Sequence, residues 1–285
     1  GSERSPDAVA AGVRVPRQVC IVEQDQELLN RIAVAFLSKG YIVNPAQKEE
    51  SVSRPSCAIG WSCWQIVMTY RDKLKATLSP IEGRIFARLN SAKKIQDYLD
   101  TLAINFEIKK ETYMSPRRVI RAQTAHCFEG ALFACATLAY HGQKSLLLDL
   151  VTIARDEDHV VALFKERGLW GAISKTNHPI LRYRDPVYKT VRELAMSYFH
   201  EYILNDGTKS LRRYSKSFDL SRYSPLKWIT AEDDLHWLAD ALDESPHLEI
   251  APPKTIRRLR KASKLEVRAI NIVEWKEPKG FKQSY

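Results

Sequence analysis

The stretch AHCFEGALFACATLAYHG, residues 125–142, decides the fold together with three short runs that follow it. From Cys127 to Tyr140 nearly every residue is apolar or small, which predicts a helix buried on most sides and ended at Gly142. The next runs have the pattern of strands: SLLLDLVTI (145–153), HVVALFK (159–165) and GLWGAIS (168–174). This order predicts an α+β fold, in which a buried helix packs on an antiparallel sheet.

Two residues of this stretch are candidates for nucleophilic chemistry. Cys127 stands in the first turn of the helix, where unpaired backbone N–H groups and the helix dipole favour the thiolate. His159 begins the second strand, and a helix packed across the sheet can bring the thiol beside this imidazole. The imidazole could then act as a base and later as an acid. Cys135 lies two turns further along the helix and is expected in the core.

The order of these features resembles that of the transglutaminase-like superfamily, and in particular bacterial transglutaminase-like proteins. The resemblance rests on AHCFEGALFACATLAYHG, LLLDL, DHVVALF and GLWGAIS, with IQDYLDTL before them and RYRDPVY after them. It implies a papain-like core with Cys127 as the nucleophile and His159 as the base. Members of the superfamily cross-link glutamine to amines, hydrolyse amide bonds or form them. The resemblance therefore implies cysteine-dependent acyl transfer or amide hydrolysis through a thioester.

The third position of the family's Cys, His and Asp set departs from the pattern. The family usually places an aspartate four residues after the tryptophan of the third strand, but Ser174 stands at that distance from Trp170. Hairpin geometry gives the same residue, because a loop at positions 166–167 pairs Lys165 with Gly168 and sets Ser174 opposite His159. A serine can accept a hydrogen bond from the imidazole, but it supplies no charge to stabilise imidazolium.

Other residues could take this third position, and the sequence leaves the choice open. Asn177 lies just past the strand, Asp185 lies in RYRDPVY, and Asp149 lies on the neighbouring strand, where it could share a face with His159. The backbone N–H of Cys127 would begin an oxyanion hole, to which the Gln123 side chain could add a donor. Trp170 is expected to pack under the imidazole or in the core. Glu129 could pair with an arginine or line the cleft.

The flanking segments predict three parts. Residues 1–78 form an accessory segment whose first 16 residues are loose, with a helix from Gln26 to Lys39 between an Asp25 cap and Gly40. Residues 79–205 form the core, which ends in a long helix from Val187 to Leu204. Residues 206–285 form a mixed, basic extension with a helix over Ala231 to Leu242 capped by Thr230. An alternating apolar pattern at 265, 267, 270 and 272 predicts a strand or core-facing segment there.

Composition excludes several classes of protein. The chain of 285 residues is 45% hydrophobic and 27% charged, which is ordinary for a globular protein. It has no apolar run long enough to cross a bilayer and no signal peptide at its start, so we expect no membrane association. The five cysteines lack zinc or disulfide spacing, which favours a reducing, cytoplasmic setting. No phosphate loop, dinucleotide motif or HExxH occurs, so no metal or cofactor is implied.

Two rival functions belong to other classes. The leading function expects a peptide, a protein or a small amide or acyl compound as substrate. The missing aspartate would instead suit a catalytically impaired binding protein on this fold. The net charge of +10 is concentrated after residue 250, where ten Lys or Arg stand against three Glu, as in a polyanion-binding patch. Aliphatic residues rather than aromatics interleave with that charge, so nucleic-acid binding is not the expected function. The sequence does not determine the oligomeric state.

Overall fold

The computed structural model describes residues 18–22, 25–38, 42–46, 64–66, 68–108 and 110–278. The chain divides into two compact units, Gly1–Thr69 and Tyr70–Tyr285. None of the described helices has the length and apolar composition needed to cross a membrane.

The first unit has a three-stranded parallel sheet in the order β2-β1-β3. Its elements are β1 (Gln18–Val22), α1 (Gln26–Leu37), β2 (Ile42–Ala46) and β3 (Trp64–Ile66). The predicted cap of α1 is confirmed, because the Asp25 carboxylate accepts a hydrogen bond from Leu28 N at 3.1 Å. The helix ends at Leu37, earlier than predicted, and the predicted stop at Gly40 lies outside the described residues.

The second unit is a mixed α and β structure built on an antiparallel sheet in the order β12-β10-β6-β7-β8-β9, with β11 also paired to β6. Its helices are α2 (Tyr70–Thr77), α3 (Pro80–Arg88), α4 (Ala92–Thr101), α5 (Pro116–Ala122), α6 (Cys127–Tyr140), α7 (Val191–Tyr198), α8 (Pro225–Trp228), α9 (His236–Asp243), α10 (Pro253–Ile256) and α11 (Lys264–Ile270). The sheet strands are β6 (Leu146–Val151), β7 (His159–Glu166), β8 (Leu169–Ile173), β9 (Arg184–Tyr188), β10 (Arg213–Ser215), β11 (Phe218–Asp219) and β12 (His247–Glu249). A short parallel pair, β4 (Ala103–Ile104) with β5 (Thr124–Ala125), precedes α6.

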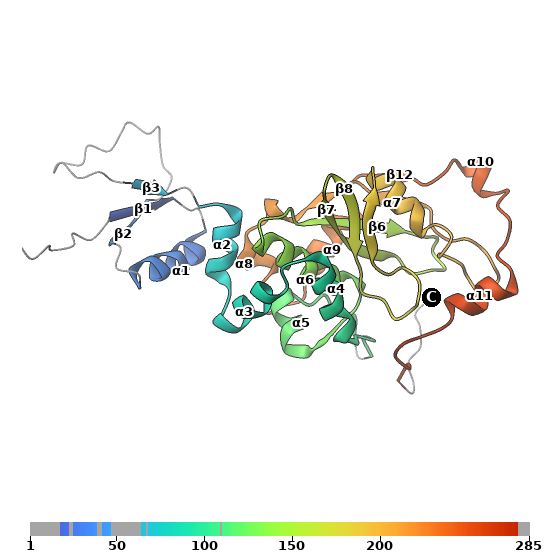
Figure 1. Ribbon diagram of the computed structural model, residues 1–285, viewed down its shortest axis with the longest axis horizontal. Helices are drawn as coiled ribbons and strands as arrows, with labels where there is room; N and C mark the ends of the chain where they lie inside the picture. Colours follow the sequence, from blue (N-terminus) through green and yellow to red (C-terminus); the bar gives the residue numbers. More distant parts are fainter. Residues whose placement is uncertain are drawn as a thin grey trace, which may run out of the picture. The chain divides into compact units, whose positions relative to one another are not determined.

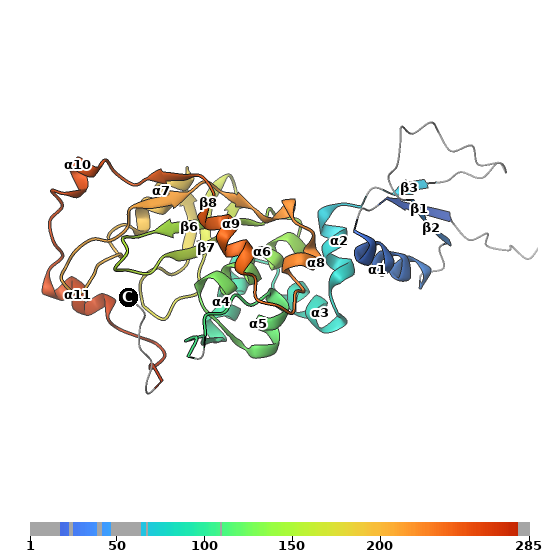
Figure 2. The ribbon, with the colours of Figure 1, turned by 180° about the vertical axis from the view of Figure 1, so that it is seen from behind.

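Helices cover both faces of the sheet (Figure 1). The buried helix α6 packs on one face, where Ala162 and Phe164 of β7 join a core that includes Phe133 of α6. The opposite face packs against α7, where Leu194 belongs to the same cluster as Val161 of β7. Every residue of α6 from Phe128 to Ala139 is buried, as its apolar sequence predicted. The view from behind shows the same layers, with α9 beside α6 (Figure 2).

The hairpin between β7 and β8 turns one residue later than predicted. Its loop is Arg167-Gly168, and both residues have positive φ values of 49° and 86°, which a two-residue hairpin turn requires and glycine adopts without strain. Glu166 therefore pairs with Leu169, instead of Lys165 with Gly168. The correction shifts the partner of each β7 residue by two positions. Side chains alternate with period two, so the predicted face of each residue is unchanged.

The long helix predicted from Val187 to Leu204 is wrong at its start and its end. Residues 184–188 form β9, which pairs with β8 through Tyr188 and Trp170. The helix α7 begins only after Thr190, whose side chain accepts from Glu193 N, and it ends at Tyr198. The helix predicted from Ala231 is likewise shorter, because Asp234 binds Arg118 and Tyr113 N and holds that segment outside the helix.

The compact units begin and end at other residues than the predicted parts. The break between the compact units falls after Thr69, and α2 packs against α6 and α8 within the second unit. The segment after residue 205 is part of the sheet, to which it adds β10, β11 and β12. The strand or core-facing segment predicted near Leu265 is a helix, α11, with no buried residue, and Leu265 is 67% exposed.

A buried acid on β6 gives the stability of this unit a pH dependence. Asp149 is 2% exposed, and its carboxylate lies 3.1 Å from His247 Nε2 on β12. Burial raises the pKa of Asp149 to about 6, although the hydrogen bond from His247 acts to lower that pKa. The unfolded value is about 3.9, so the contribution of Asp149 to stability is full below pH ~4 and is lost as pH rises through ~6.

We expect Asp149→Asn to remove this dependence, because an amide does not ionise. Between pH 4.5 and 7.5 the unfolding free energy of the wild type should fall by about 2 kcal/mol relative to the variant. Urea unfolding at both pH values measures the difference. Asp185→Asn, at an exposed position on β9, is the control and should track the wild type. Parallel curves for wild type and Asp149→Asn would contradict the prediction.

Candidate active site

Cys127 is the first residue of α6, a free cysteine that is half-buried at the start of a helix whose next residues are buried. His126 is the N-cap residue: its ring Nδ1 lies 3.3 Å from Phe128 N, and its carbonyl accepts from Gly130 N. The backbone N–H of Cys127 therefore belongs to the first turn, which has no acceptors within the helix. Such groups and the helix dipole favour an anion at the sulfur.

His159 begins β7 and is 6% exposed. Its Nε2 lies 2.7 Å from Ser174 Oγ, and the Ser174 hydroxyl donates to the carbonyl of Leu181 at 2.5 Å. Since the single proton of the hydroxyl is used by Leu181, Ser174 must accept from His159, so Nε2 carries a proton. This arrangement leaves Nδ1 as the ring nitrogen for Cys127.

The structure brings Cys127 and His159 together, with His126 on the same sulfur. Both imidazoles act on the Cys127 side chain and favour its ionised form. Burial acts to raise the pKa of the thiol, but the hydrogen bonds and charges of His126 and His159 outweigh burial and hold that pKa well below its usual range. These contacts favour the thiolate, which is the form that attacks carbonyl carbon.

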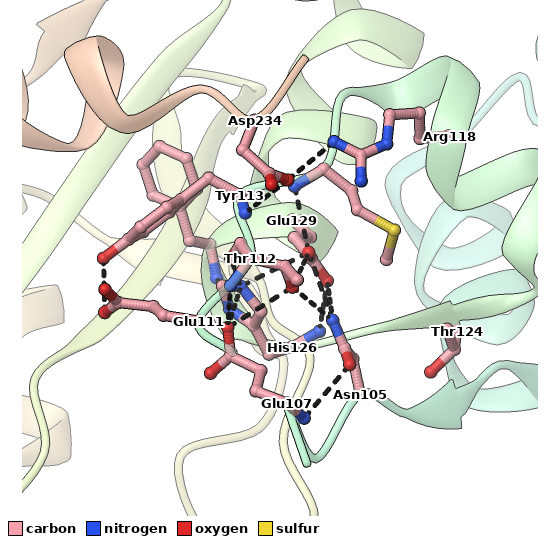
Figure 3. Close-up of polar contacts among 12 residues, drawn as sticks. Asn105, Glu107, Glu111, Thr112, Tyr113, Arg118, Thr124, His126, Glu129 and Asp234 are labelled. Carbon is pink, nitrogen blue, oxygen red and sulfur yellow. Dashed lines mark hydrogen bonds and ion pairs between the residues drawn. The ribbon is translucent and has the colours of Figure 1, made fainter. Parts of the chain in front are cut away.

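His126 was not predicted from the sequence. Its Nε2 lies 2.8 Å from the carbonyl of Thr112, 3.5 Å from Glu129 and 3.6 Å from Glu107 (Figure 3). Burial acts to lower the pKa of His126, but the hydrogen bond with Cys127 and the nearby Glu129, Cys127 and Glu107 charges raise it to about 10. The spacing His126-x-x-Glu129 is that of a capping box and could have indicated this pair, although histidine is not among the preferred caps.

Glu129 is fully buried and lies at the centre of the polar cluster in Figure 3. Its carboxylate accepts from Met114 N at 2.9 Å, His126 N at 3.0 Å, Thr112 Oγ1 at 3.0 Å and Asn105 Nδ2 at 3.1 Å. Every one of these partners is a donor, so the cluster suits the ionised acid. Glu129 does not pair with an arginine in the described chain, where Arg118 binds Asp234 instead.

Of the residues considered for the third position, only Ser174 contacts His159. Asn177 lines the same cleft, but its side chain binds the backbone N and O of Trp275, at 2.8 and 3.0 Å. Asp185 is exposed on β9 and does not line the cleft. Asp149 lies opposite Val160, the neighbour of His159, and so faces the other side of the sheet, towards His247.

The register predicted for β7 and β8 was wrong, but the predicted contact between His159 and Ser174 is present. With the observed hairpin, position 176 rather than Ser174 would stand opposite His159. Ser174 is the diagonal neighbour on the same face, within reach of the imidazole. The exposed amide of Gln123 donates to the carbonyl of Ile120, and Gln123 does not line the cleft. The Lys165 ammonium lies over the Trp170 ring, 5.1 Å from the ring centre, and Trp170 does not line the cleft.

Two buried side chains fix Ser174 from behind. The Gln96 amide clamps its backbone, donating to Ser174 O at 2.8 Å and accepting from Ser174 N at 3.0 Å. The next residue, Lys175, is 1% exposed and donates to the carbonyl of Leu102 at 2.5 Å. Its stem lies so close to α6 that a Cβ on Gly130 would stand 2.5 Å from Lys175 Cβ. Gly130 therefore permits β8 to end beside the first turn of α6.

Cys127 and His159 line a cleft of about 680 Å³. Seven carboxylates border it (Glu107, Glu111, Asp156, Glu157, Asp158, Glu201 and Glu277). Lys175 is the one Lys or Arg in this lining, and its ammonium is directed to Leu102. Glu201 pairs with Arg184, which lies outside this lining, at 2.6 Å, and the other six carboxylates leave the cleft negative overall. In the described ranges no three His, Cys, Asp or Glu side chains stand close enough to hold a metal ion.

One wall of the cleft is a C-terminal strap, which we define as residues 270–277. Ile270, Asn271, Val273 and Glu277 line the cleft. Asn177 holds the strap through Trp275, Arg182 pairs with Glu274 at 2.6 Å, and His178 Nδ1 lies 2.9 Å from the carbonyl of Ile270. The expected role of Asn177 beside the imidazole is therefore replaced by a role in holding this wall.

Comparison with known proteins adds no assignment. The chain matches no protein-family model, and no curated protein matches it.

The hydrogen bond between Ser174 and His159 can be tested directly. We expect Ser174→Ala to slow any reaction that uses His159 by about tenfold, because the ring loses the acceptor that orients it. The cost in stability should be about 1 kcal/mol, since the Nε2 proton is left buried and unpaired. Rates and melting temperatures of both proteins measure these effects.

Asn177→Ala is the matched control for Ser174→Ala. It removes a side chain in the same cleft that contacts the strap rather than His159. Its pH–rate profile should keep the midpoints of the wild type. If Asn177→Ala moved the midpoint assigned to His159 and Ser174→Ala did not, Asn177 rather than Ser174 would hold the imidazole.

Proposed function

We propose that this protein is a cysteine-dependent acyltransferase or amide hydrolase with a transglutaminase-like, papain-like core, in which Cys127 is the nucleophile and His159 moves the proton. The observation that carries the proposal is the placement of Cys127 and His159 in one cleft, where His126 and His159 hold the pKa of the thiol below its usual range. A buried cysteine without function would not need either feature. Cys127 and Cys135 are both free thiols, which suits a reducing, cytoplasmic setting.

The chemistry proceeds in two balanced steps. The Cys127 thiolate attacks the carbonyl carbon of an amide, and the negative charge passes to the carbonyl oxygen, near the first-turn N–H groups of α6. The C–N bond then breaks as His159 imidazolium gives its proton to the leaving nitrogen, which leaves a thioester. Water or an amine attacks the thioester and returns a proton to His159. The C–S bond breaks and restores the thiolate.

The charge of the cleft favours a substrate or acyl acceptor that carries positive charge. Glu157 and Asp158 directly precede His159. The one Lys or Arg in the described lining is Lys175, and its ammonium donates to the Leu102 carbonyl instead of neutralising them. Carboxylates in a partly enclosed cleft raise the local concentration of cations. A primary amine on a peptide, protein or small molecule therefore fits better than an acidic acceptor.

Labelling with an acyl-type thiol probe, followed by release of the acyl group to water or to a cationic amine, tests the proposal. We expect Cys127 to be labelled and the group to be released in the wild type. His159→Asn should retain labelling by alkylating agents but lose release. Labelling and release that are unchanged in His159→Asn would overturn the assignment of His159. Stable probe binding with no transfer in the wild type would favour a binding protein on this fold. The presence of Ser174 in place of an aspartate would agree with that function.

A further inference from the structure

We propose that His126 is a second catalytic imidazole, and that it, rather than His159, is the standing counter-cation of the Cys127 thiolate. The inference rests on the proposed function and assigns a role to a residue that the Cys-His-Asp pattern does not include. It explains how a site with serine at the third position can keep its nucleophile ionised.

The two imidazoles differ in what stands behind them. His159 is backed by the neutral hydroxyl of Ser174, at 2.7 Å, which supplies no negative charge. His126 is backed by two carboxylates, Glu129 at 3.5 Å and Glu107 at 3.6 Å. A carboxylate behind an imidazole stabilises its charged form. The charge that the family places behind one histidine therefore stands here behind the other.

The burial of Glu129 gives an independent argument. A nearby cation stabilises a fully buried carboxylate beyond what its donors supply, because a charge in the interior is costly. In the described part of the chain no Lys or Arg nitrogen lies within 4 Å of the Glu129 carboxylate. The His126 ring is the one group within that distance that can carry a positive charge. Protonation of His126 would therefore balance two anions, Glu129 on one side and the Cys127 sulfur on the other.

The hydrogen bonds of His126 fix where its protons lie. Nε2 stands 2.8 Å from the Thr112 carbonyl, which accepts a hydrogen bond, so this nitrogen carries a proton in either charge state. Nδ1 can accept from Phe128 N or donate to the thiolate, but a single nitrogen cannot do both. When Nδ1 donates to sulfur, the Phe128 N–H is released and joins that of Cys127 in the first turn, where an oxyanion would form.

This arrangement divides the work between the two histidines. His126 keeps the sulfur ionised before attack and when sulfur leaves the tetrahedral intermediate, without giving up its proton. In the reactive form both rings are protonated, and His159 imidazolium gives its Nδ1 proton to the leaving nitrogen and takes a proton back from the attacking water or amine.

Thiolate absorbance as a function of pH tests the assignment without requiring turnover. The absorbance of each protein, less that of its Cys127→Ser counterpart, isolates this one sulfur. We expect His126→Asn to raise the thiolate midpoint by about two pH units, because one opposite charge is worth about that much. His159→Asn should move the midpoint by less than half as much. Asparagine is a good N-cap, so His126→Asn should keep the helix start and its melting temperature.

An unchanged midpoint in His126→Asn, or equal shifts in the two variants, would overturn the inference. If His126→Asn did not fold, Glu107→Gln would carry the test: a rise in the midpoint supports the inference, and no change overturns it. Failure of the proposed function would look different. A folded protein with an ionised Cys127 and no acyl transfer would reject the function and leave the role of His126 intact.

Discussion

Cys127→Ser should lose acyl transfer by at least about a thousandfold while the protein stays folded. The change replaces a readily ionised sulfur by an alcohol that His159, backed only by the neutral Ser174, activates poorly. Position 127 is the first residue of α6, next to the cap, where serine is well tolerated. The melting temperature should therefore stay within about 2 °C of the wild type, which corresponds to less than about 1 kcal/mol.

Cys135→Ser is the matched control and should do the reverse. Cys135 is fully buried, burial raises the pKa of its thiol, and its Sγ donates to the carbonyl of Leu146 at 3.3 Å. A serine there can keep that hydrogen bond, but it buries a more polar group, at a cost of about 1 kcal/mol. Activity per folded molecule should survive. Full activity in Cys127→Ser, or probe labelling on Cys135, would show that the nucleophile is misassigned.

Glu129→Gln should be among the most destabilising single changes near the site. The amide keeps the size of the side chain, but its NH2 group replaces one of the two carboxylate oxygens. In one orientation this donor faces the N–H of His126, and in the other it faces the donors of Met114 and Thr112. A buried donor without an acceptor and the lost charge together cost about 3 kcal/mol. For a unit of this size the melting temperature should fall by about 6 to 12 °C.

Glu111→Gln is the comparison for that experiment. Glu111 borders the same cleft, but it is exposed and accepts only from the Tyr113 hydroxyl. Its substitution should change the free energy of unfolding by less than about 0.5 kcal/mol. Equal melting temperatures for Glu129→Gln and Glu111→Gln would show that the Glu129 cluster does not hold the helix start.

The parts of this fold that sequence could predict are those set by local patterns. The apolar run from Phe128 to Ala139 and the period-two strands around it gave α6, β6, β7 and β8 in the right order. Cys127 and His159 were proposed because both stand at the starts of these elements, and they line one cleft. The turn at Arg167-Gly168 was misplaced by one residue, since Glu166 extends the strand and the glycine takes the second loop position.

The third position and the second histidine depend on contacts between distant segments. Ser174 is held by Gln96, 78 positions earlier, and this pairing leaves no local pattern. Glu129 becomes a buried anion only because Asn105 and Thr112 converge on it from another loop. Asn177 was a candidate for the third position because it follows Ser174 closely in the sequence. Its amide instead hydrogen-bonds to Trp275, and no local sequence pattern predicts a contact between residues so far apart.

The strap has a consequence for the order in which the protein folds. The helix and hairpin that carry Cys127 and His159 lie within about 50 residues of each other, so their contacts form early and at a small cost in chain entropy. The bonds between Asn177 and Trp275 close a loop of 98 residues with a few exposed hydrogen bonds. We therefore expect this wall to close last and to open first, as a local event that leaves the sheet intact. Access to the thiol would then be governed by the peeling of a short peptide rather than by any movement of the core.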